Sequence, residues 1–286
     1  MNTTESGRGS RRVIRVAHSP DSDDAFMFFG LASGEIDTAE LDFEHELQGI
    51  QELNERAMRG ELEVTAVSIH AYAYLTDRYM LLPHGASMGE GYGPRLVSRA
   101  PMDRNAIRSS TIAIPGELTS AYLALKLWEP AARTVVMPFD EILEAVRDGQ
   151  VDVGLIIHEG QLTYADEDLV LLEDLGRWWK EETGLPLPLG GNVIRRDLGP
   201  DLIPRVSDYL RRSIAFSLDH RERAMDYAMG FARGLDRGTA DEFVGMYVNQ
   251  RTLEYGPDGR EAVHLFLERG VQAGLLPGPV RVEFAD

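Results

Sequence analysis

Short apolar runs rich in β-branched residues alternate with segments of helical period along residues 13–157. Glycine or proline stands at most of the joints between them. This alternation is typical of β-α-β units and predicts an α/β protein with largely parallel sheets. The first series, whose helices end at Gly34 and Gly60, has strands at residues 13–17, 41–47 and 64–69 and helices at 25–33 and 50–59.

A second series of the same kind begins near residue 111, and Gly149 ends its second helix. Its elements are strands at residues 111–114, 134–137 and 151–157 and helices at 120–128 and 140–147. After one more strand at 192–195, the chain is almost entirely helical in period from Pro200 onward. Because a helical tail has to cover apolar surface, we expect it to pack back on the first unit.

This returning tail predicts two passages of the chain between lobes, near residues 98–104 and 187–192. We therefore expect a two-lobed α/β fold with a cleft between the lobes. The expected parts are a discontinuous large lobe with a helical C-terminal part at residues 12–100 and 191–286, an inserted small α/β lobe at 101–190, and a disordered leader at 1–11.

Composition narrows the range of partners and chemistry. The chain has 29 Lys and Arg against 47 Asp and Glu, a formal net charge of −18, which repels nucleic acid and anionic membrane surfaces. It has no cysteine, so disulfides, thiolate nucleophiles and cysteine metal sites are excluded. No stretch approaches the roughly 18 apolar residues needed to cross a bilayer, and the apolar run after the polar leader is too short for a signal peptide. We expect a cytoplasmic protein with a small-molecule ligand and no cofactor.

Two histidines stand at the carboxyl ends of predicted strands, where open α/β sheets bind ligands. Ile157-His158 ends one strand and Ile69-His70 ends another. An imidazole at His158 could titrate near neutrality and act as a general base, oriented by Glu159 or by a more distant carboxylate. The alternative is a structural histidine that is hydrogen-bonded to a loop carbonyl, and the sequence leaves both interpretations open.

The loop after the first strand is rich in carboxylates. It reads His18-Ser19-Pro20-Asp21-Ser22-Asp23-Asp24 ahead of an apolar helix. A calcium loop would continue with further spaced acids and a final Glu, which are missing here. We therefore favour a helix cap at Ser22, Asp23 or Asp24 over a metal site. The loop follows a strand's carboxyl end, so we expect it to line the cleft.

A second polar cluster, Thr119-Ser120-Ala121-Tyr122, opens the helix at residues 120–128. The free N–H groups and hydroxyls at a helix start bind carboxylates well, although a plain Thr or Ser cap explains the same residues. The glycine-rich segment 85–94 lacks the Lys-Ser/Thr ending of a P-loop, and no long helix follows it as in a dinucleotide fingerprint. These glycines instead permit a tight crossing or a close approach of the backbone to a ligand.

Taken together, these motifs resemble the menaquinone-biosynthesis family of the futalosine pathway, and most closely its 1,4-dihydroxy-6-naphthoate synthases. The similarity runs from Val13 almost to the C-terminus. Its most specific blocks are Gly154-Leu155-Ile156-Ile157-His158-Glu159 and Gly184-Leu185-Pro186-Leu187-Pro188-Leu189-Gly190. Other matching positions are Ser19-Pro20 with Asp24 and Phe26, Glu52-Leu53-Asn54, Ser68 with Tyr72, Gly85-Ala86 through Gly93-Pro94, and Thr119-Ser120-Ala121-Tyr122.

The resemblance implies the fold of type II periplasmic solute-binding proteins, with the active site between two α/β lobes. It also implies a carbon–carbon lyase that converts cyclic dehypoxanthinylfutalosine to 1,4-dihydroxy-6-naphthoate without metal or organic cofactor. His158 would be the base that starts ring opening. The substrate-binding residues that we expect, from the resemblance and from the two polar clusters, are Ser19, Asp24, Asn54, Ser68, His70, Thr119, Ser120 and Ala121.

Two departures from the family pattern bear on the substrate. The family usually reads Ser-Pro-Cys-Pro-Asn-Asp-Thr-Phe where this chain has residues 19–26, so Asp21 and Asp23 are added carboxylates beside a pocket for a carboxylate ligand. Their charge would disfavour that anion. His70 stands where a small or apolar residue is expected. Two alternatives therefore stay open: an enzyme of a sister subfamily with a related substrate, and a non-catalytic solute-binding protein or sensor of the same fold.

Overall fold

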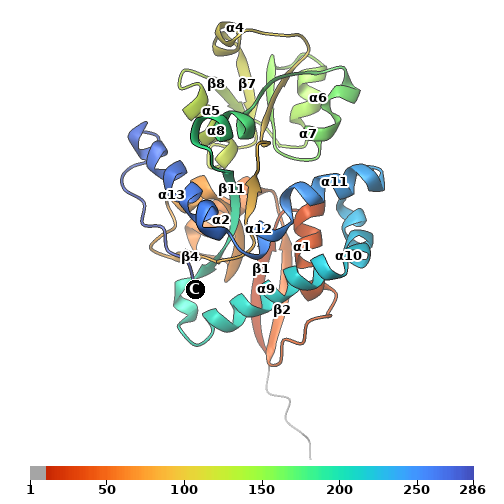
Figure 1. The fold of residues 1–286 in the computed structure, drawn as a ribbon, viewed down its shortest axis with the longest axis vertical. Coiled ribbons are helices and arrows are strands. Elements are labelled where there is room, and N and C mark those ends of the chain that lie inside the picture. Colours follow the sequence, from red (N-terminus) through yellow and green to blue (C-terminus); the bar gives the residue numbers. More distant parts are fainter. Residues whose placement is uncertain (1–10) are drawn as a thin grey trace, which may run out of the picture.

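Two mixed β-sheets organise the chain, one in each lobe (Figure 1). The computed structural model describes residues 11–286. The six-stranded sheet has the order β2-β1-β3-β11-β4, and β5 also pairs with β11. Its strands are β1 (Arg12–His18), β2 (Leu41–Leu47), β3 (Val64–Ser68), β4 (Tyr79–Leu81), β5 (Ser87–Gly89) and β11 (Leu187–Arg195). The two-lobed α/β fold is thereby confirmed.

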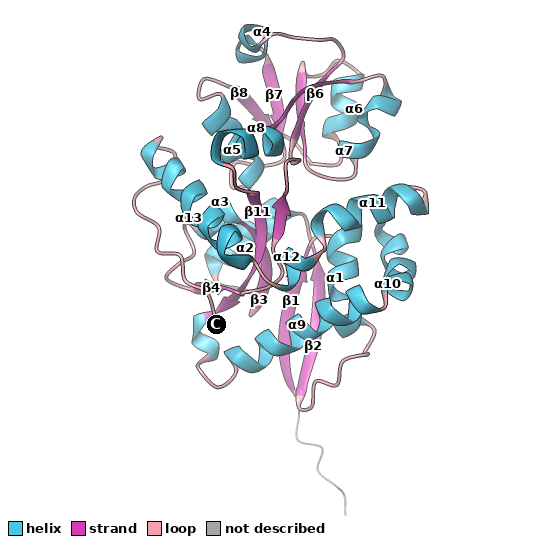
Figure 2. Cartoon of the chain, viewed as in Figure 1, coloured by secondary structure: helices cyan, strands magenta, loops and turns pink. Residues whose placement is uncertain are grey.

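The second sheet has five strands in the order β10-β6-β9-β7-β8. They are β6 (Arg95–Ser98), β7 (Thr111–Ile114), β8 (Arg133–Val136), β9 (Val153–Ile156) and β10 (Val170–Asp174). Helices surround both sheets (Figure 2). Those of the first half are α1 (Ser22–Ala32), α2 (Ile50–Arg59), α3 (Ile69–Tyr72), α4 (Arg104–Ser109), α5 (Ser120–Trp128), α6 (Ile142–Arg147), α7 (Gly160–Thr163) and α8 (Leu175–Thr183).

The C-terminal part is helical, as expected, and returns to the first lobe (Figure 1). Its helices are α9 (Ile203–Asp219), α10 (Arg221–Ala228), α11 (Arg237–Tyr247), α12 (Gln250–Leu253) and α13 (Gly256–Gln272). Helices α9, α10 and α11 pack around α1, which explains why α1 is buried on almost every side from Ala25 to Leu31. The last residues pair with β4, where the Ala285 amide donates to the Leu81 carbonyl at 2.8 Å.

The expectation of largely parallel sheets is wrong in one half of each sheet. β1 is parallel to β2 and β3, and β7 is parallel to β8 and β9. β11 is antiparallel to β3, β4 and β5, and β6 is antiparallel to β9 and β10. β11 and β6 each enter their sheet from the other lobe and not through a crossover helix. Because parallel neighbours in a sheet require a crossover connection, these two strands are free to pair antiparallel.

The chain passes between the sheets earlier than expected. β5 pairs in the first sheet and β6 in the second, so the first passage lies between Gly89 and Arg95 and not at residues 98–104. A tight turn makes this possible: a Cβ on Gly89 would stand 1.9 Å from the Tyr92 carbonyl oxygen. The return lies between α8 and β11, because Leu187 already pairs with Gly89. Residues 95–98 thus belong to the sheet of the inserted lobe and 187–190 to that of the large lobe.

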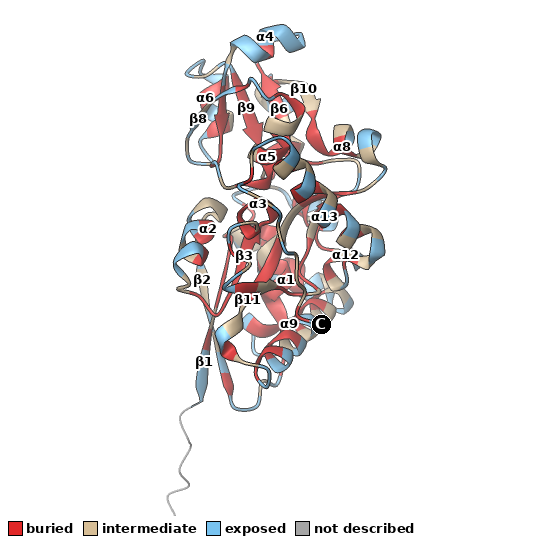
Figure 3. Ribbon diagram, turned by 90° about the vertical axis from the view of Figure 1, so that its left-hand side faces the viewer, coloured by how far each residue is buried: buried red, intermediate tan, exposed pale blue. Residues whose placement is uncertain are grey.

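The largest apolar core cluster continues from one lobe into the other (Figure 3). Trp179 of α8 is fully buried, and its ring meets Phe266 of α13 edge-on at 5.3 Å between centroids. Its indole N–H donates to the Pro186 carbonyl at 3.0 Å. This packing fixes the two lobes to each other on one side of the cleft. Within residues 11–286, none of the helices is both long enough and apolar enough to span a bilayer.

Candidate functional site

A cavity of about 810 Å³, its open mouth included, lies between the two sheets. Residues of both lobes line it. The polar side chains on its wall come from the loop before α1 and the first turn of that helix, from β3, β5 and β11, from the start of α5, and from helices α7 and α11. Apolar side chains also line it: Met27, Ile50, Ile157, Leu189 and Phe243. The cavity therefore offers both polar and apolar surface to a ligand.

Six of the predicted site residues line this cavity: Ser19, Asp24, Ser68, Thr119, Ser120 and Ala121. Asn54 and His70 lie directly behind the wall. The Asn54 amide nitrogen donates to Ser68 Oγ at 3.1 Å, and its Oδ1 accepts the Ser68 N–H at 2.9 Å. The His70 N–H donates to Ser120 Oγ at 3.1 Å. Both residues thus orient groups of the wall rather than form its surface.

The wall at the start of α5 presents free backbone N–H groups. Thr119 is the N-cap, and its Oγ1 accepts the Tyr122 N–H at 3.1 Å. The amides of Ser120 and Ala121 make no hydrogen bond among the described residues, as is usual for the first helical positions. Two N–H donors and the hydroxyl of Ser68 therefore face the cavity with the positive end of a helix behind them, an arrangement that suits a carboxylate.

The wall at the start of α1 carries three carboxylates, and none of them caps the helix. The helix begins at Ser22 after Asp21, whose side chain makes no cap hydrogen bond, so the expected cap at Ser22, Asp23 or Asp24 is wrong. Asp24 instead accepts the N–H of Ser19 at 2.7 Å. The Asp21 side chain is turned away from the helix amides because it is hydrogen-bonded by the Ser19 hydroxyl at 2.8 Å.

Burial changes the charge of this acidic wall. It raises the pKa of Asp24 to about 6 and holds the pKa of Asp23 well above its ordinary value, and the neighbouring carboxylates Asp21 and Glu159 add to the effect on Asp23. Asp23 therefore keeps its proton to a higher pH than an ordinary carboxyl group, and Asp21 has Arg233 as its counter-ion at 2.5 Å. The loop consequently repels an anion less than its three carboxylates suggest.

His158 lies at the end of β9, beside the cavity wall but not on its surface. Its Nδ1 accepts the Gly160 N–H at 3.0 Å, and its ring meets Phe139 edge-on. Nε2 is buried and has no hydrogen-bond partner among residues 11–286. Burial lowers the pKa of His158, although the carboxylates of Glu159 and Asp21 oppose this. The ring is therefore neutral, and in this geometry its hydrogen is on Nε2.

Several wall residues escaped the sequence analysis. Gln161 of α7 and Tyr247 of α11 line the cavity and are joined by a hydrogen bond of 2.8 Å from the Tyr247 hydroxyl. Asn192 of β11 also lines it. Among these missed residues, the sequence pointed only to the position of Asn192, through the neighbouring Gly85. The φ of Gly85 is +78°, and a Cβ there would stand 2.1 Å from the Asn192 amide nitrogen. The backbone at Gly85 thus lies close to the Asn192 side chain, and the close approach to a ligand that was expected for this segment stays a prediction.

The described part of the chain contains no cluster of three or more His, Asp or Glu side chains placed to hold a metal ion. The three carboxylates near the start of α1 have different partners: Asp24 accepts the Ser19 N–H, Asp21 pairs with Arg233, and Asp23 lines the cavity. The side chains on the cavity wall include none of lysine, arginine or histidine. An anionic ligand on this wall therefore meets neutral donors, among them the N–H groups at the start of α5.

Comparison with known proteins identifies the family of the chain. Residues 14–272 match the profile of a family described as Menaquinone biosynthesis. The chain is 39% identical to the 1,4-dihydroxy-6-naphtoate synthase of Streptomyces coelicolor over 284 residues, which cover 96% of this chain and 99% of that protein. It is also 39% identical to the enzyme of the same name from Thermus thermophilus over 268 residues, or 93% and 97% of the two chains.

Solved structures are similar over nearly the same length. Protein AF1704 of Archaeoglobus fulgidus superposes with a TM-score of 0.89 at 46% identity, covering 92% of this chain and 98% of that one. The alkanesulfonate-binding protein SsuA of Xanthomonas axonopodis has a TM-score of 0.69 at 14% identity, covering 96% and 97%. The second match establishes the fold alone, which is that of the periplasmic binding proteins, as expected from the sequence.

Proposed function

Since the chain belongs to the menaquinone biosynthesis family, we propose that it converts cyclic dehypoxanthinylfutalosine to 1,4-dihydroxy-6-naphthoate, with His158 as the general base. Its role as a lyase-type enzyme of menaquinone biosynthesis follows from the family. The substrate and the base are our proposal. It includes a cytoplasmic location, a small-molecule carboxylate as ligand, and a reaction without metal or organic cofactor.

The observation that supports this substrate is the lining of the cavity, which combines free amides at the start of α5 with apolar side chains. The product named for the relatives has a carboxylate on an apolar ring system. The free amides of Ser120 and Ala121 suit the carboxylate. Side chains such as Ile157, Leu189 and Phe243 suit the ring system. The acidic wall with Asp23 and Asp24 remains for the hydroxyl groups at the other end of the substrate.

The base proposal requires one tautomer of His158. With Nδ1 accepting the Gly160 N–H, Nε2 holds the proton and cannot take another. Catalysis therefore uses the other neutral tautomer, in which Nδ1–H points toward Glu159 Oε2, now 3.9 Å away, and Nε2 is free. Nε2 then removes a proton from the substrate, and the nearby carboxylate stabilises the imidazolium that forms. Breaking the carbon–carbon bond of the substrate follows from that proton transfer.

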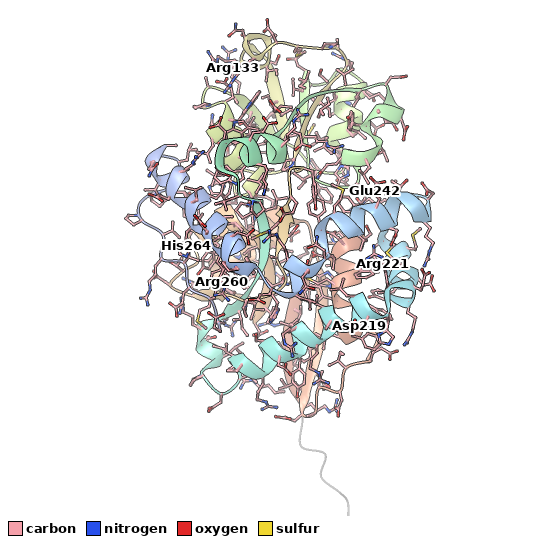
Figure 4. All side chains as sticks on the ribbon, in the orientation of Figure 1. Arg133, Asp219, Arg221, Glu242, Arg260 and His264 are labelled. Atoms are coloured by element: carbon pink, nitrogen blue, oxygen red, sulfur yellow. The ribbon has the colours of Figure 1, made fainter. Side chains whose placement is uncertain are left out.

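The test is incubation of the purified protein with cyclic dehypoxanthinylfutalosine, with the product followed by mass spectrometry. We expect product from the wild type and a fall in kcat of about 10²- to 10⁴-fold in His158→Ala. Binding of the product, measured by calorimetry, should survive in this variant. His264→Ala is the control, because His264 is exposed on the outer side of α13 (Figure 4).

Two outcomes would contradict the proposal. Equal kcat for wild type and His158→Ala would remove His158 as the base. No product from a folded wild type with the substrate intact would favour a sister-subfamily substrate or a non-catalytic binding protein. Measuring whether 1,4-dihydroxy-6-naphthoate binds without turnover then separates a sister-subfamily enzyme from a non-catalytic binding protein.

A further inference from the structure

Arg233 joins the two lobes beside the cavity. Its Nη2 lies 2.5 Å from Asp21 Oδ1, and its Nη1 lies 2.9 Å from Glu159 Oε2. Asp21 stands before α1 in the large lobe, whereas Glu159 follows β9 of the other sheet. One guanidinium thus holds a carboxylate from each side of the cleft. Opening the lobes would have to separate at least one of these pairs.

The small-lobe partner is deeply buried, so this ion pair is unlike an ordinary surface pair. The Glu159 side chain is only 4% exposed. Its other oxygen accepts the hydroxyl of Ser22, the first residue of α1, at 3.1 Å. The Arg233 guanidinium also lies over the ring of Phe139 at 4.9 Å from the centroid. A buried carboxylate that loses its cation is left uncompensated, and such a loss costs much more than breaking an exposed pair.

The backbone at Arg233 is held in a conformation that favours this contact. Its φ is +49°, in the left-handed region that residues with a side chain rarely adopt, and Gly234 follows at +82°. The segment lies between the 3₁₀ turn Met229–Phe231 and α11. Unfavourable backbone conformations of this kind concentrate at functional contacts, where surrounding interactions maintain them.

The same bridge touches the residue that we propose as the base. Glu159 Oε2, the oxygen bound by Arg233, is also the one that lies 3.9 Å from His158 Nδ1. Arg233 therefore fixes the carboxylate toward which Nδ1–H must point. Without the guanidinium, this carboxylate can rotate away from the ring, and the lobe that carries both Glu159 and His158 can move away from the acidic loop.

We propose that Arg233 closes the cleft by bridging Asp21 and Glu159, and that the bridge positions His158 beside the cavity. Arg233 is thus a positioning residue, not a catalytic one. Asp21 belongs to the acidic loop that departs from the family pattern, and the bridge gives this added carboxylate a structural role as a partner of Arg233. The closure part stands independently of the reaction, whereas the His158 part rests on the proposed function.

Arg233→Met tests closure without any ligand. Small-angle X-ray scattering of the full-length chain should give a larger radius of gyration than the wild type. Arg260→Met is a matched control, because Arg260 pairs with Asp286 at 2.6 Å and lies over the ring of Phe284 within one lobe. The two arginine side chains are also equally exposed, 32% and 31%. A folded Arg233→Met with the radius of the wild type would overturn the proposal.

Kinetics with cyclic dehypoxanthinylfutalosine test the positioning part. A charge-assisted bond is worth about 1.5–3 kcal/mol, so we expect Arg233→Met to lower kcat/KM by about 10- to 100-fold. Arg233→Lys should recover part of the loss, and Arg260→Met should lose nothing. Glu159→Gln combined with Arg233→Met should cost little more than either change alone, since both break one bridge. Additive losses in the double variant would contradict a shared bridge.

The two proposals fail in different ways. A larger radius in Arg233→Met together with an inactive wild type would uphold closure and reject the proposed substrate. An active wild type whose Arg233→Met variant keeps both its radius and its kcat/KM would uphold the enzyme and reject the bridge.

Discussion

The two polar walls of the cavity are built from the same local structure but carry opposite chemistry. Each consists of a strand, a short loop and the first turn of a helix: β1 leads to α1, and β7 leads to α5. At α5 the side chain of Thr119 caps the helix and leaves the next amides free. At α1 the corresponding residue, Asp21, caps nothing and instead binds Arg233.

The difference shows that the side chains around a helix start, and not its backbone, determine whether its free N–H groups are available to a ligand. Both helices direct the positive end of their dipole at the cavity. The α5 start offers this potential to a ligand, whereas the α1 start is covered by its own acids. Since burial raises the pKa of Asp23 and Asp21 is paired with Arg233, the acidic wall repels an anionic ligand group less than three ionised carboxylates would. The cavity can thus hold a ligand whose two ends differ in charge.

Lowering the pH should reduce the free energy of unfolding through histidines next to both walls, and this is the largest effect that we expect. His18 ends β1 before the acidic wall and His70 lies behind the α5 wall; burial lowers the pKa of His18 to about 3 and that of His70 to about 4. The unfolded chain therefore binds more protons below pH 6.5, so their contribution to stability is complete above that pH and is lost as the pH falls. The raised pKa values of Asp23 and Asp24 act in the opposite direction.

The histidines outweigh the two acids because burial lowers the pKa values of five of them, His18, His45, His70, His84 and His158. We expect the free energy of unfolding to fall by about 3–5 kcal/mol from pH 7 to pH 5. Urea unfolding at several pH values measures it, and His70→Gln should flatten the curve. The exposed His264→Gln serves as control (Figure 4). A His70→Gln curve as steep as the wild-type curve would contradict this assignment.

Removing one amide at the α5 wall should have the next largest effect. Ser120→Pro deletes the N–H at the first helical position, which proline tolerates because Thr119 is extended with ψ of 148°. Ser120→Ala loses the same hydroxyl but keeps the amide. We expect product binding, measured by calorimetry, to weaken about 10- to 100-fold more in Ser120→Pro, as for a hydrogen bond to a charged group. Equal affinities would show that the carboxylate does not bind at α5.

Ligand binding at the acidic wall should depend on pH, and the isosteric change Asp23→Asn should reduce that dependence. As the pH rises through the raised pKa of Asp23, this group ionises beside Asp21, Asp24 and Glu159 and places a new charge in the cavity. Binding of an anionic ligand should then weaken several-fold in the wild type, whereas Asp23→Asn should show a smaller dependence on pH. Titrations over a series of pH values measure it.

Asp219→Asn is the control for that experiment, because Asp219 is exposed at the end of α9 (Figure 4). It should keep the wild-type dependence on pH. If Asp23→Asn also keeps that dependence, another group at the cavity titrates and the ionisation of Asp23 does not control binding.

Removing the α5 cap should have the smallest effect. Thr119→Ala takes away the acceptor for the Tyr122 N–H, and we expect a loss of about 1 kcal/mol in the free energy of unfolding. Thr119→Ser should restore it. Urea unfolding measures both, and no difference between the alanine and serine variants would show that the cap contributes nothing.

Much of the fold could be predicted because strong local patterns mark it. The strands at 41–47 and 111–114 and the helices at 50–59 and 120–128 coincide with β2, β7, α2 and α5. Gly60 ends α2 with φ of +71°, as a helix-terminating glycine should. Short antiparallel strands such as β5 and β6 were missed, since their pairing partners lie far along the chain and no local pattern encodes the register.

The site was predictable where it follows strand ends and helix starts. Ser19, Ser68 and Ser120 stand at such joints, and all line the cavity. Arg233 was not predictable, because nothing in a helical tail marks an arginine whose partners lie in two other parts of the chain. The charge of Asp23 was also hidden, since it depends on burial and not on the sequence around it.

The most direct test of this account is a crystal structure of the protein with 1,4-dihydroxy-6-naphthoate bound. The account predicts that the ligand carboxylate lies about 2.7–3.1 Å from the backbone nitrogens of Ser120 and Ala121, with its rings against the apolar side chains Ile157, Leu189 and Phe243. A carboxylate bound at the α1 wall, with Arg233 drawn away from Asp21 to meet it, would contradict the assignment of opposite roles to the two walls.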